Sequence, residues 1–281
     1  MTHKHPQTPM RRWLLASALI AVLALLISSA SCSAVALATP AMAAACNGDA
    51  ITAPGLRRAV FEGAIDISPS NSRARLRTQY LIAADTLVEE AESRKAALRI
   101  VTFGASGVGA RTVVQVTFAD VSHDELFNLA AANKARCAAR LAVRTALTTG
   151  RRWNGGGTDV AGTLSTIIAD GKTRVEPGGS LTVTLLTDGC QAPATSGPNR
   201  RLTDLCGALA HGTSAQRILQ RHPAEFAIGR AAGATIVMKG IGVSGDPNSA
   251  NSLQAKKLIA FWQLVCHRAQ AGRCVIGSSV L

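Results

Sequence analysis

The stretch Ala59-Val60-Phe61-Glu62-Gly63-Ala64-Ile65-Asp66-Ile67-Ser68-Pro69-Ser70 determines the predicted fold. It is typical of a buried strand that ends in a polar turn. Asp66, Ser68 and Ser70 occupy alternate positions, and an extended backbone directs alternate side chains the same way. We therefore expect three oxygen-bearing side chains at the carboxyl end of this strand, where open α/β sheets bind their ligands. Oxygen donors without His or Cys favour a hard divalent cation such as Mg²⁺.

Strands and helices alternate along the rest of the sequence. Strands are expected at about 58–68, 97–103, 112–118, 181–186 and 235–243, and helices at about 71–95, 120–147 and 160–169. Two short helical pieces within 200–221, a helical segment at 226–232 and a closing helix at 249–271 complete the prediction. The glycine-rich turn at 104–111 should join two strands as an antiparallel hairpin. This order predicts an α/β fold with a mostly parallel sheet, helices on both faces and one antiparallel edge strand.

The first 43 residues differ from the rest of the chain. Three basic residues precede an uncharged apolar run at about 13–38, and Ala41-Met42-Ala43 fits the small-x-small pattern of signal-peptide cleavage. We expect 1–43 to be a secretory signal peptide, 44–55 a polar lead-in and 56–281 one α/β domain. Two alternatives stay open: an uncleaved membrane anchor, or a lipid on Cys32 or Cys46. Attachment to a membrane is expected only in these two alternatives. With a cleaved signal peptide or with either alternative, we expect a secreted or cell-envelope protein outside the cytoplasm.

The cysteines agree with export. Six of the seven follow the predicted cleavage site, namely Cys46, Cys137, Cys190, Cys206, Cys266 and Cys274. In an oxidising compartment this even number indicates up to three disulfides, for which fifteen connectivities are possible. Short loops favour Cys190–Cys206 and Cys266–Cys274. The absence of CxxC spacing argues against a zinc site.

The chain is basic, with a formal net charge of +13. After residue 43, 27 basic and 17 acidic residues remain, which is a net charge of +10. Such an excess favours acidic partners or anionic surfaces. Aromatic residues make up only 4% of the sequence, and they do not form the basic and aromatic stripe of a nucleic-acid reader. We therefore interpret the charge as solvated, Arg-rich helix faces and expect no nucleic-acid partner.

Two further segments carry residues that would complete the predicted cation site. Thr158 follows the glycines at 155–157 and precedes a helix, and Asp188 lies in Thr187-Asp188-Gly189 at the end of an apolar strand. In a doubly wound sheet, both segments would meet Asp66 and its serines at one edge. Each segment alone also fits a helix cap or a turn. Together, in this order, they favour a single site.

In these three motifs the chain resembles the von Willebrand factor type A (VWA) domain. That family carries a metal-ion-dependent adhesion site (MIDAS) built from Asp-x-Ser-x-Ser, a Thr and an Asp, which correspond here to Asp66, Ser68, Ser70, Thr158 and Asp188. The resemblance covers roughly residues 56–271. It implies a Rossmann-like, doubly wound fold and a bound Mg²⁺, or Mn²⁺ or Ca²⁺. It also implies direct coordination by the three hydroxyls, with both aspartates acting directly or through water.

The resemblance further implies a function. The domain would be an extracytoplasmic binding or adhesion module that captures a carboxylate of a protein or cell-surface ligand through the cation. Asp159 is expected to cap the following helix. The alternative is an enzyme that uses Mg²⁺ for hydrolysis or phosphoryl transfer, and a third possibility is an envelope protein that acts through its basic surface. We favour a non-enzymatic protein because the sequence shows no nucleophile elbow, phosphate loop, second metal cluster or paired general base.

Overall fold

The structure is a computed structural model that describes residues 56–68, 74–104, 111–118, 125–149, 157–193, 201–243 and 253–278. All of them belong to one structural unit, Cys46–Leu281. The predicted signal peptide, the lead-in and Ser70 lie outside the described residues. Among the described helices, none combines the length and the apolar character needed to cross a bilayer.

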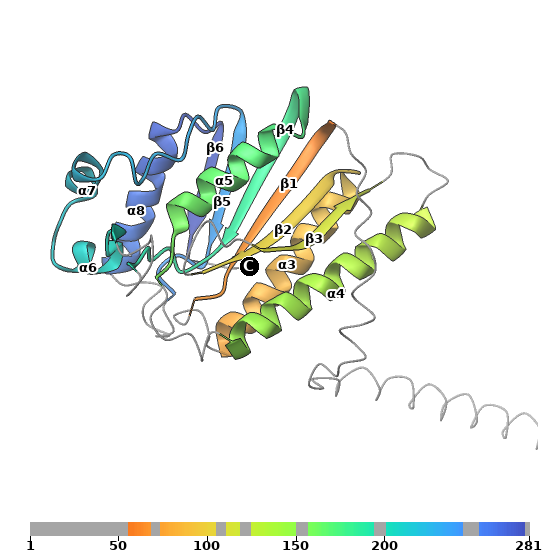
Figure 1. Ribbon diagram of the computed structural model, residues 1–281, viewed down its shortest axis with the longest axis horizontal. Helices are drawn as coiled ribbons and strands as arrows, with labels where there is room; N and C mark the ends of the chain where they lie inside the picture. The colour runs from red at the N-terminus through yellow and green to blue at the C-terminus, as the bar shows by residue number, and fades with distance from the viewer. Residues whose placement is uncertain are drawn as a thin grey trace, which may run out of the picture. The chain divides into compact units, whose positions relative to one another are not determined.

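Six strands form one sheet in the order β3-β2-β1-β4-β5-β6. The strands are β1 (Arg57–Asp66), β2 (Ala97–Phe103), β3 (Arg111–Thr117), β4 (Val175–Leu186), β5 (Ala234–Lys239) and β6 (Arg273–Gly277). All neighbouring pairs are parallel except β2 and β3, which confirms the predicted hairpin and the antiparallel edge strand. The central strands β1 and β4 pair Ile65 with Leu186, so their carboxyl ends lie level with each other (Figure 1).

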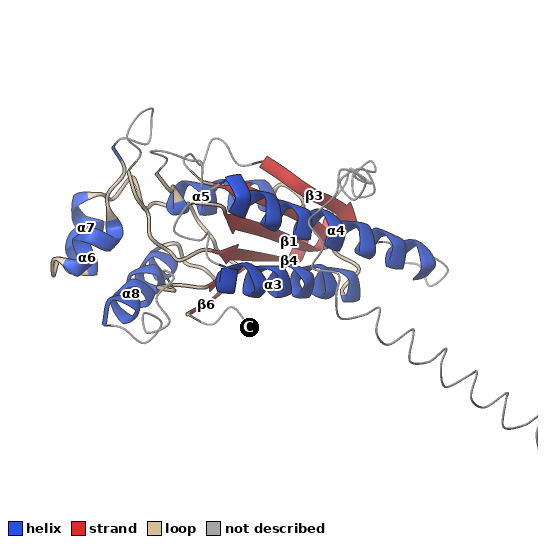
Figure 2. Ribbon diagram, turned by 90° about the horizontal axis from the view of Figure 1, so that it is seen from below, coloured by secondary structure: helices blue, strands red, loops and turns tan. Residues whose placement is uncertain are grey.

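Helices cover both faces of this sheet, as predicted. They are α3 (Ala74–Ser93), α4 (Glu125–Thr149), α5 (Val160–Lys172), α6 (Leu205–Ala210), α7 (Ala215–Arg221) and α8 (Leu253–Arg268). The buried side chains of α3 and α4 pack on one face, and those of α5 to α8 pack on the other. Figure 2 shows α3 and α4 lying along the strands. The α/β, Rossmann-like fold class is therefore confirmed.

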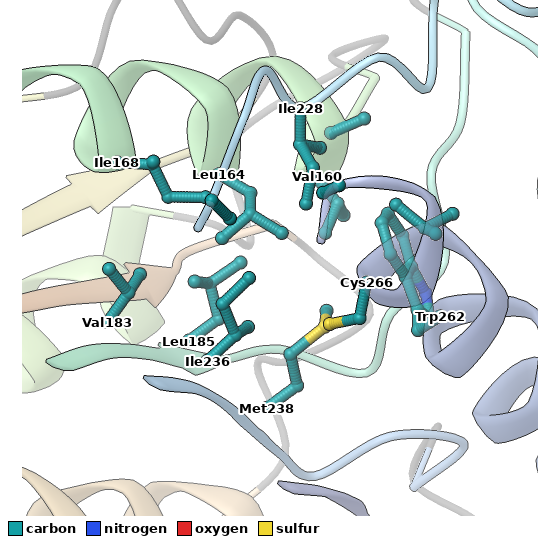
Figure 3. Close-up of a cluster of buried hydrophobic side chains, with 14 of the residues drawn as sticks. Val160, Leu164, Ile168, Val183, Leu185, Ile228, Ile236, Met238, Trp262 and Cys266 are labelled. Atoms are coloured by element: carbon teal, nitrogen blue, oxygen red, sulfur yellow. The ribbon is translucent and has the colours of Figure 1, made fainter. Parts of the chain in front are cut away.

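The larger core lies on the face of the sheet that α5 and α8 cover. Val160, Leu164 and Ile168 recur every four residues, which places them on one side of α5 (Figure 3). They share this core with Val183 and Leu185, whose alternation in β4 directs both side chains to the same face of the sheet. Each of these five side chains is at most 2% exposed, and burial of a side chain of this size contributes about 1.5 to 3 kcal/mol.

The structure differs from the sequence prediction in the last third of the chain. The segment 226–232 is not helical, because Phe226 and Ile228 are buried at alternate positions and Gly229 has a φ of +70°. The strand predicted at 235–243 ends at Lys239, because the chain turns at glycines with positive φ. The predicted closing helix is followed by β6, which is short and only partly buried and therefore lacks a clear strand pattern.

A buried charge cluster joins β1, β2 and α5. Glu62 in β1 is fully buried and accepts a hydrogen bond from Nε of Arg99 at 2.8 Å. Arg99 also pairs with Asp170 of α5 at 2.8 Å, and Arg174 pairs with the second carboxylate oxygen of Glu62. A buried carboxylate without partners is costly, so these pairings explain how an acidic residue is tolerated in the central strand. The sequence analysis did not predict this cluster.

The cysteines follow the prediction in part. Cys190 and Cys206 form the expected disulfide, and Cys137 is also disulfide-bonded. Cys266 and Cys274 are free thiols that hydrogen-bond to each other across the α8 and β6 contact, so the bond expected between them is not formed.

Candidate functional site

The turn after β1 buries two of the predicted site residues. Asp66 is 2% exposed and Ser68 is 4% exposed. Oδ1 of Asp66 accepts a hydrogen bond from the backbone N–H of Ser68 at 2.9 Å, which closes an Asx turn. The N–H of Ile67 donates to the carbonyl of Phe103 at 2.8 Å, so the chain stays paired to β2 beyond the last residue of β1. Two hydrogen bonds therefore fix the turn that follows Asp66.

The turn after β4 repeats this arrangement. Asp188 is 1% exposed, and its Oδ1 accepts a hydrogen bond from the N–H of Cys190 at 2.9 Å. The hydroxyl of Thr187 donates to Oδ2 of Asp66 at 2.7 Å and accepts from the N–H of Gly189 at 3.0 Å. Thr187 thus connects the two turns, and this role did not follow from the sequence.

The third segment contributes Thr158, which is 4% exposed. It forms an isolated antiparallel bridge with Ala192, with N–H to O distances of 2.9 and 3.0 Å. This bridge ties Thr158 to the loop that follows Asp188. Asp159 caps α5 as predicted, since its Oδ1 accepts from the N–H of Gly162 at 2.7 Å.

Several contacts hold the loop at Asp188 in place. Gly189 has a φ of +77°, which favours glycine, and Nε1 of Trp262 in α8 donates to its carbonyl at 3.0 Å. The carbonyl of Asp188 accepts from the N–H of Gly242 at 2.8 Å. The Cys190–Cys206 disulfide then anchors the loop to α6. Contacts of this kind hold the ligating residues of a binding site in position.

The two carboxylates influence each other. Burial, and then the nearby charge of Asp188, raise the pKa of Asp66 from 3.8 to about 7. Hydrogen bonds from Ser68 and Thr187 lower this pKa only in part. Burial and both carboxylates also raise the pKa of Tyr80, whose ring packs in the core beneath the site. Two buried carboxyl groups this close together are more favourable when a cation lies between them.

The residues present fit a hard divalent cation. Asp66 and Ser68 follow β1, Asp188 follows the adjacent β4, and Thr158 is bridged to the loop after Asp188. All four are buried and offer only oxygen atoms, which are the donors that Mg²⁺ and Ca²⁺ prefer. Among the described residues, no group of three or more His, Cys, Asp or Glu side chains is placed to hold a metal, so any cation here would depend on the hydroxyls.

Known proteins provide little further information. No family model matches the sequence, and no curated protein matches it. Among solved structures, the pilus adhesin SpaC from Lactobacillus rhamnosus GG, in an open conformation, matches with 13% identity and a TM-score of 0.42 over 83% of this chain and 29% of that chain. A point mutant of the PilB minor pilin from Streptococcus sanguinis matches with 13% identity and a TM-score of 0.46, over 83% and 59% of the two chains.

A third solved structure is proximal thread matrix protein 1 from the mussel byssus. It matches with 14% identity and a TM-score of 0.33, over 77% of this chain and 49% of that chain. This chain therefore spans between 29% and 59% of the lengths of the three structures. At these identities and TM-scores, the matches assign no function.

Proposed function

We propose that this protein is an exported, non-enzymatic VWA-like binding module that captures a carboxylate of a protein or cell-surface ligand through a divalent cation. The cation, Mg²⁺ or alternatively Mn²⁺ or Ca²⁺, is held at a MIDAS formed by Asp66, Ser68, Ser70, Thr158 and Asp188. One observation carries the proposal. The buried residues Asp66 and Asp188 follow the adjacent strands β1 and β4, and Thr187 joins the two turns by a hydrogen bond to Asp66, while buried Thr158 is bridged through its backbone to the loop after Asp188.

The energetics of the carboxylates support a cation at this position. The pKa of Asp66 is raised by burial and by Asp188, so ionising both groups is unfavourable without a compensating positive charge. In the described part of the chain, the hydrogen bonds to Asp66 come from neutral donors, Ser68 and Thr187. A bound divalent cation would supply the compensating positive charge.

The hydroxyl groups determine which further ligand the bound cation can accept. Ser68 and Thr158 supply neutral oxygen atoms, so the protein neutralises the cation only through Asp66 and Asp188. Mg²⁺ keeps an octahedral shell and retains waters when protein ligands are few. A carboxylate from a partner can replace such a water. This explains why a binding function fits the donor set.

The direct test is calorimetric titration of the purified protein with Mg²⁺ and with Mn²⁺. We expect saturable binding that is lost in Asp188→Ala. Asp85→Ala is the matched control, because Asp85 lies on α3 and pairs with Arg140 away from the site. This control should bind like the unsubstituted protein. If the unsubstituted protein binds neither cation, or if Asp188→Ala binds both unchanged, the proposal is wrong.

A second measurement addresses the ligand. Acetate serves as a carboxylate probe, and it should tighten Mn²⁺ binding because both ligands meet at one ion and their affinities are linked. Chloride at equal ionic strength is the control. A protein that binds the cation but hydrolyses p-nitrophenyl phosphate in a cation-dependent reaction would instead be an enzyme, which would overturn the binding function while the cation site stands.

A further inference from the structure

Gln191 is fully buried three residues after Asp188, and its side chain bridges two elements. Its Oε1 accepts a hydrogen bond from the backbone N–H of Ala161 at 3.0 Å. Its Nε2 donates to Oε1 of Glu225. Its backbone carbonyl accepts from the N–H of Leu205 at 3.0 Å. One residue thus connects the first turn of α5, the first residue of α6 and the segment after α7.

Glu225 is itself held in place by several donors. Its Oε1 accepts from the N–H of Thr203 at 2.6 Å, and its Oε2 accepts from the hydroxyl of Thr203 at 2.8 Å. Nδ1 of His222 lies 3.4 Å from Oε2. The carboxylate of Glu225 is therefore a fixed acceptor for the amide of Gln191, and not a mobile surface group.

This network is joined to the candidate cation site through the segment that carries Thr158. Thr158 is three residues before Ala161, and its backbone bridges to Ala192, the residue after Gln191. The backbone bridge and the Gln191 side chain therefore clamp the Thr158 segment to the Asp188 loop at two points. The N–H groups in the first turn of a helix have no partner within the helix, so the N–H of Ala161 needs an external acceptor. The amide of Gln191 accepts from this N–H through its oxygen and donates to the Glu225 carboxylate through its nitrogen.

We propose that Gln191, anchored by Glu225, is a positioning residue of the cation site that holds Thr158 at its distance from Asp188. The inference rests on the proposed function, because it assigns Gln191 a role in cation affinity. Gln191 does not touch the cation. It acts through the backbone of Ala161, and so through the helix start that carries Thr158.

The test is a swap of the two side-chain functions, with Mn²⁺ titration as the readout. Gln191→Glu places a carboxylate against Glu225, and we expect Mn²⁺ affinity to fall by about 10- to 100-fold, as when the outer partners of metal ligands are lost. In the double variant Gln191→Glu with Glu225→Gln, the carboxylate accepts from Ala161 and from the new amide. In Mn²⁺ titration, the affinity of this double variant should return to within about threefold of that of the unsubstituted protein.

Gln263→Glu is the matched control, because it makes the same substitution at an exposed position of α8, and its affinity should be nearly unchanged. If Gln191→Glu does not fold, Glu225→Ala tests the same bridge from its less buried end and should weaken Mn²⁺ binding. Unchanged affinity in Gln191→Glu or, where that variant does not fold, in Glu225→Ala overturns the inference. A double variant as weak as the single one also overturns it, since the loss would then not come from the hydrogen bonds. These outcomes differ from failure of the proposed function, in which the unsubstituted protein itself binds no Mn²⁺.

Discussion

Thr187 donates its hydroxyl to Oδ2 of Asp66 at 2.7 Å, which joins the ends of β4 and β1 by a buried hydrogen bond across 121 positions of sequence. Both residues are at most 2% exposed. The same hydroxyl accepts from the N–H of Gly189, so it fixes the turn that carries Asp188. A hydroxyl group can donate and accept at once, which explains how Thr187 makes both bonds.

Replacing Thr187 by Val should therefore destabilise the site and the fold together. Val keeps the shape of the side chain but leaves Oδ2 of Asp66 and the N–H of Gly189 without this partner. We expect the free energy of unfolding to fall by about 1 to 3 kcal/mol, measured by urea denaturation. Thr187→Ser retains the hydroxyl and should lose less than half as much. Equal stability of the Val and Ser variants would contradict the role assigned to this hydrogen bond.

Stability without divalent cations should depend on pH through Asp66. Its pKa is about 7 in the folded protein and 3.8 in the unfolded chain, so between these values the native state keeps a proton that the unfolded state has released. The contribution of Asp66 to the free energy of unfolding is therefore present at low pH and is lost as pH rises through about 7. The slope for one proton is at most about 1.4 kcal/mol per pH unit. Urea denaturation in a chelator at pH 5, 6, 7 and 8 measures it.

Asp66→Asn is the control for this pH dependence, because an amide does not titrate. Its stability should change less between pH 5 and pH 8 than that of the unsubstituted protein. Cation binding should have the opposite pH dependence, since the cation binds the ionised carboxylate and competes with the proton. Mn²⁺ affinity should fall as the pH is lowered below about 7. An identical slope in Asp66→Asn would assign the pH dependence to other groups.

Gly189→Ala should disrupt the loop at Asp188. Gly189 has a φ of +77°, and a Cβ there would lie 2.7 Å from Cδ1 of Ile241 and 3.1 Å from Nε1 of Trp262. The substitution combines backbone strain with a clash, so we expect a loss of about 1 to 3 kcal/mol and weaker cation binding. Gly178→Ala is a matched control, because it has a φ of +78° and open space around it. Denaturation of both variants separates strain from the clash, and equal losses would show that the clash has no effect.

The sequence predicted most of the fold because its strongest patterns are local. β2 was predicted at its observed bounds, and α5 was predicted to begin at its observed first residue. β4 begins earlier than predicted, at Val175, because a polar, glycine-containing stretch pairs at its start with β1. β6 was missed because its pairing with β5 stabilises five residues that have no strong apolar alternation of their own.

The candidate site was predictable only in its motif residues. Asp66, Thr158 and Asp188 follow recognisable strand ends or a glycine-rich loop, so the sequence predicted that they form one site. The residues that support them could not be inferred in this way. Gln191 bonds to Glu225 across 34 positions, and Trp262 bonds to Gly189 across 73, and no local pattern encodes either contact. In the sequence alone, a Trp on the apolar face of a helix is expected to be a core residue, and a Gln in a loop is expected to be a surface residue.

The buried pair of Glu62 and Arg99 should contribute to stability but not to cation binding. Arg99→Leu removes one partner and leaves the carboxylate of Glu62 buried beside Arg174 alone, so we expect a loss of about 3 kcal/mol. Arg140→Leu breaks an exposed pair with Asp85 and should cost less than about 1 kcal/mol. Glu62 lies four residues before Asp66 within β1, so Mn²⁺ affinity of both folded variants should equal that of the unsubstituted protein. Denaturation and titration of the same samples test this, and a weaker affinity in Arg99→Leu alone would show that the charge cluster also shapes the site.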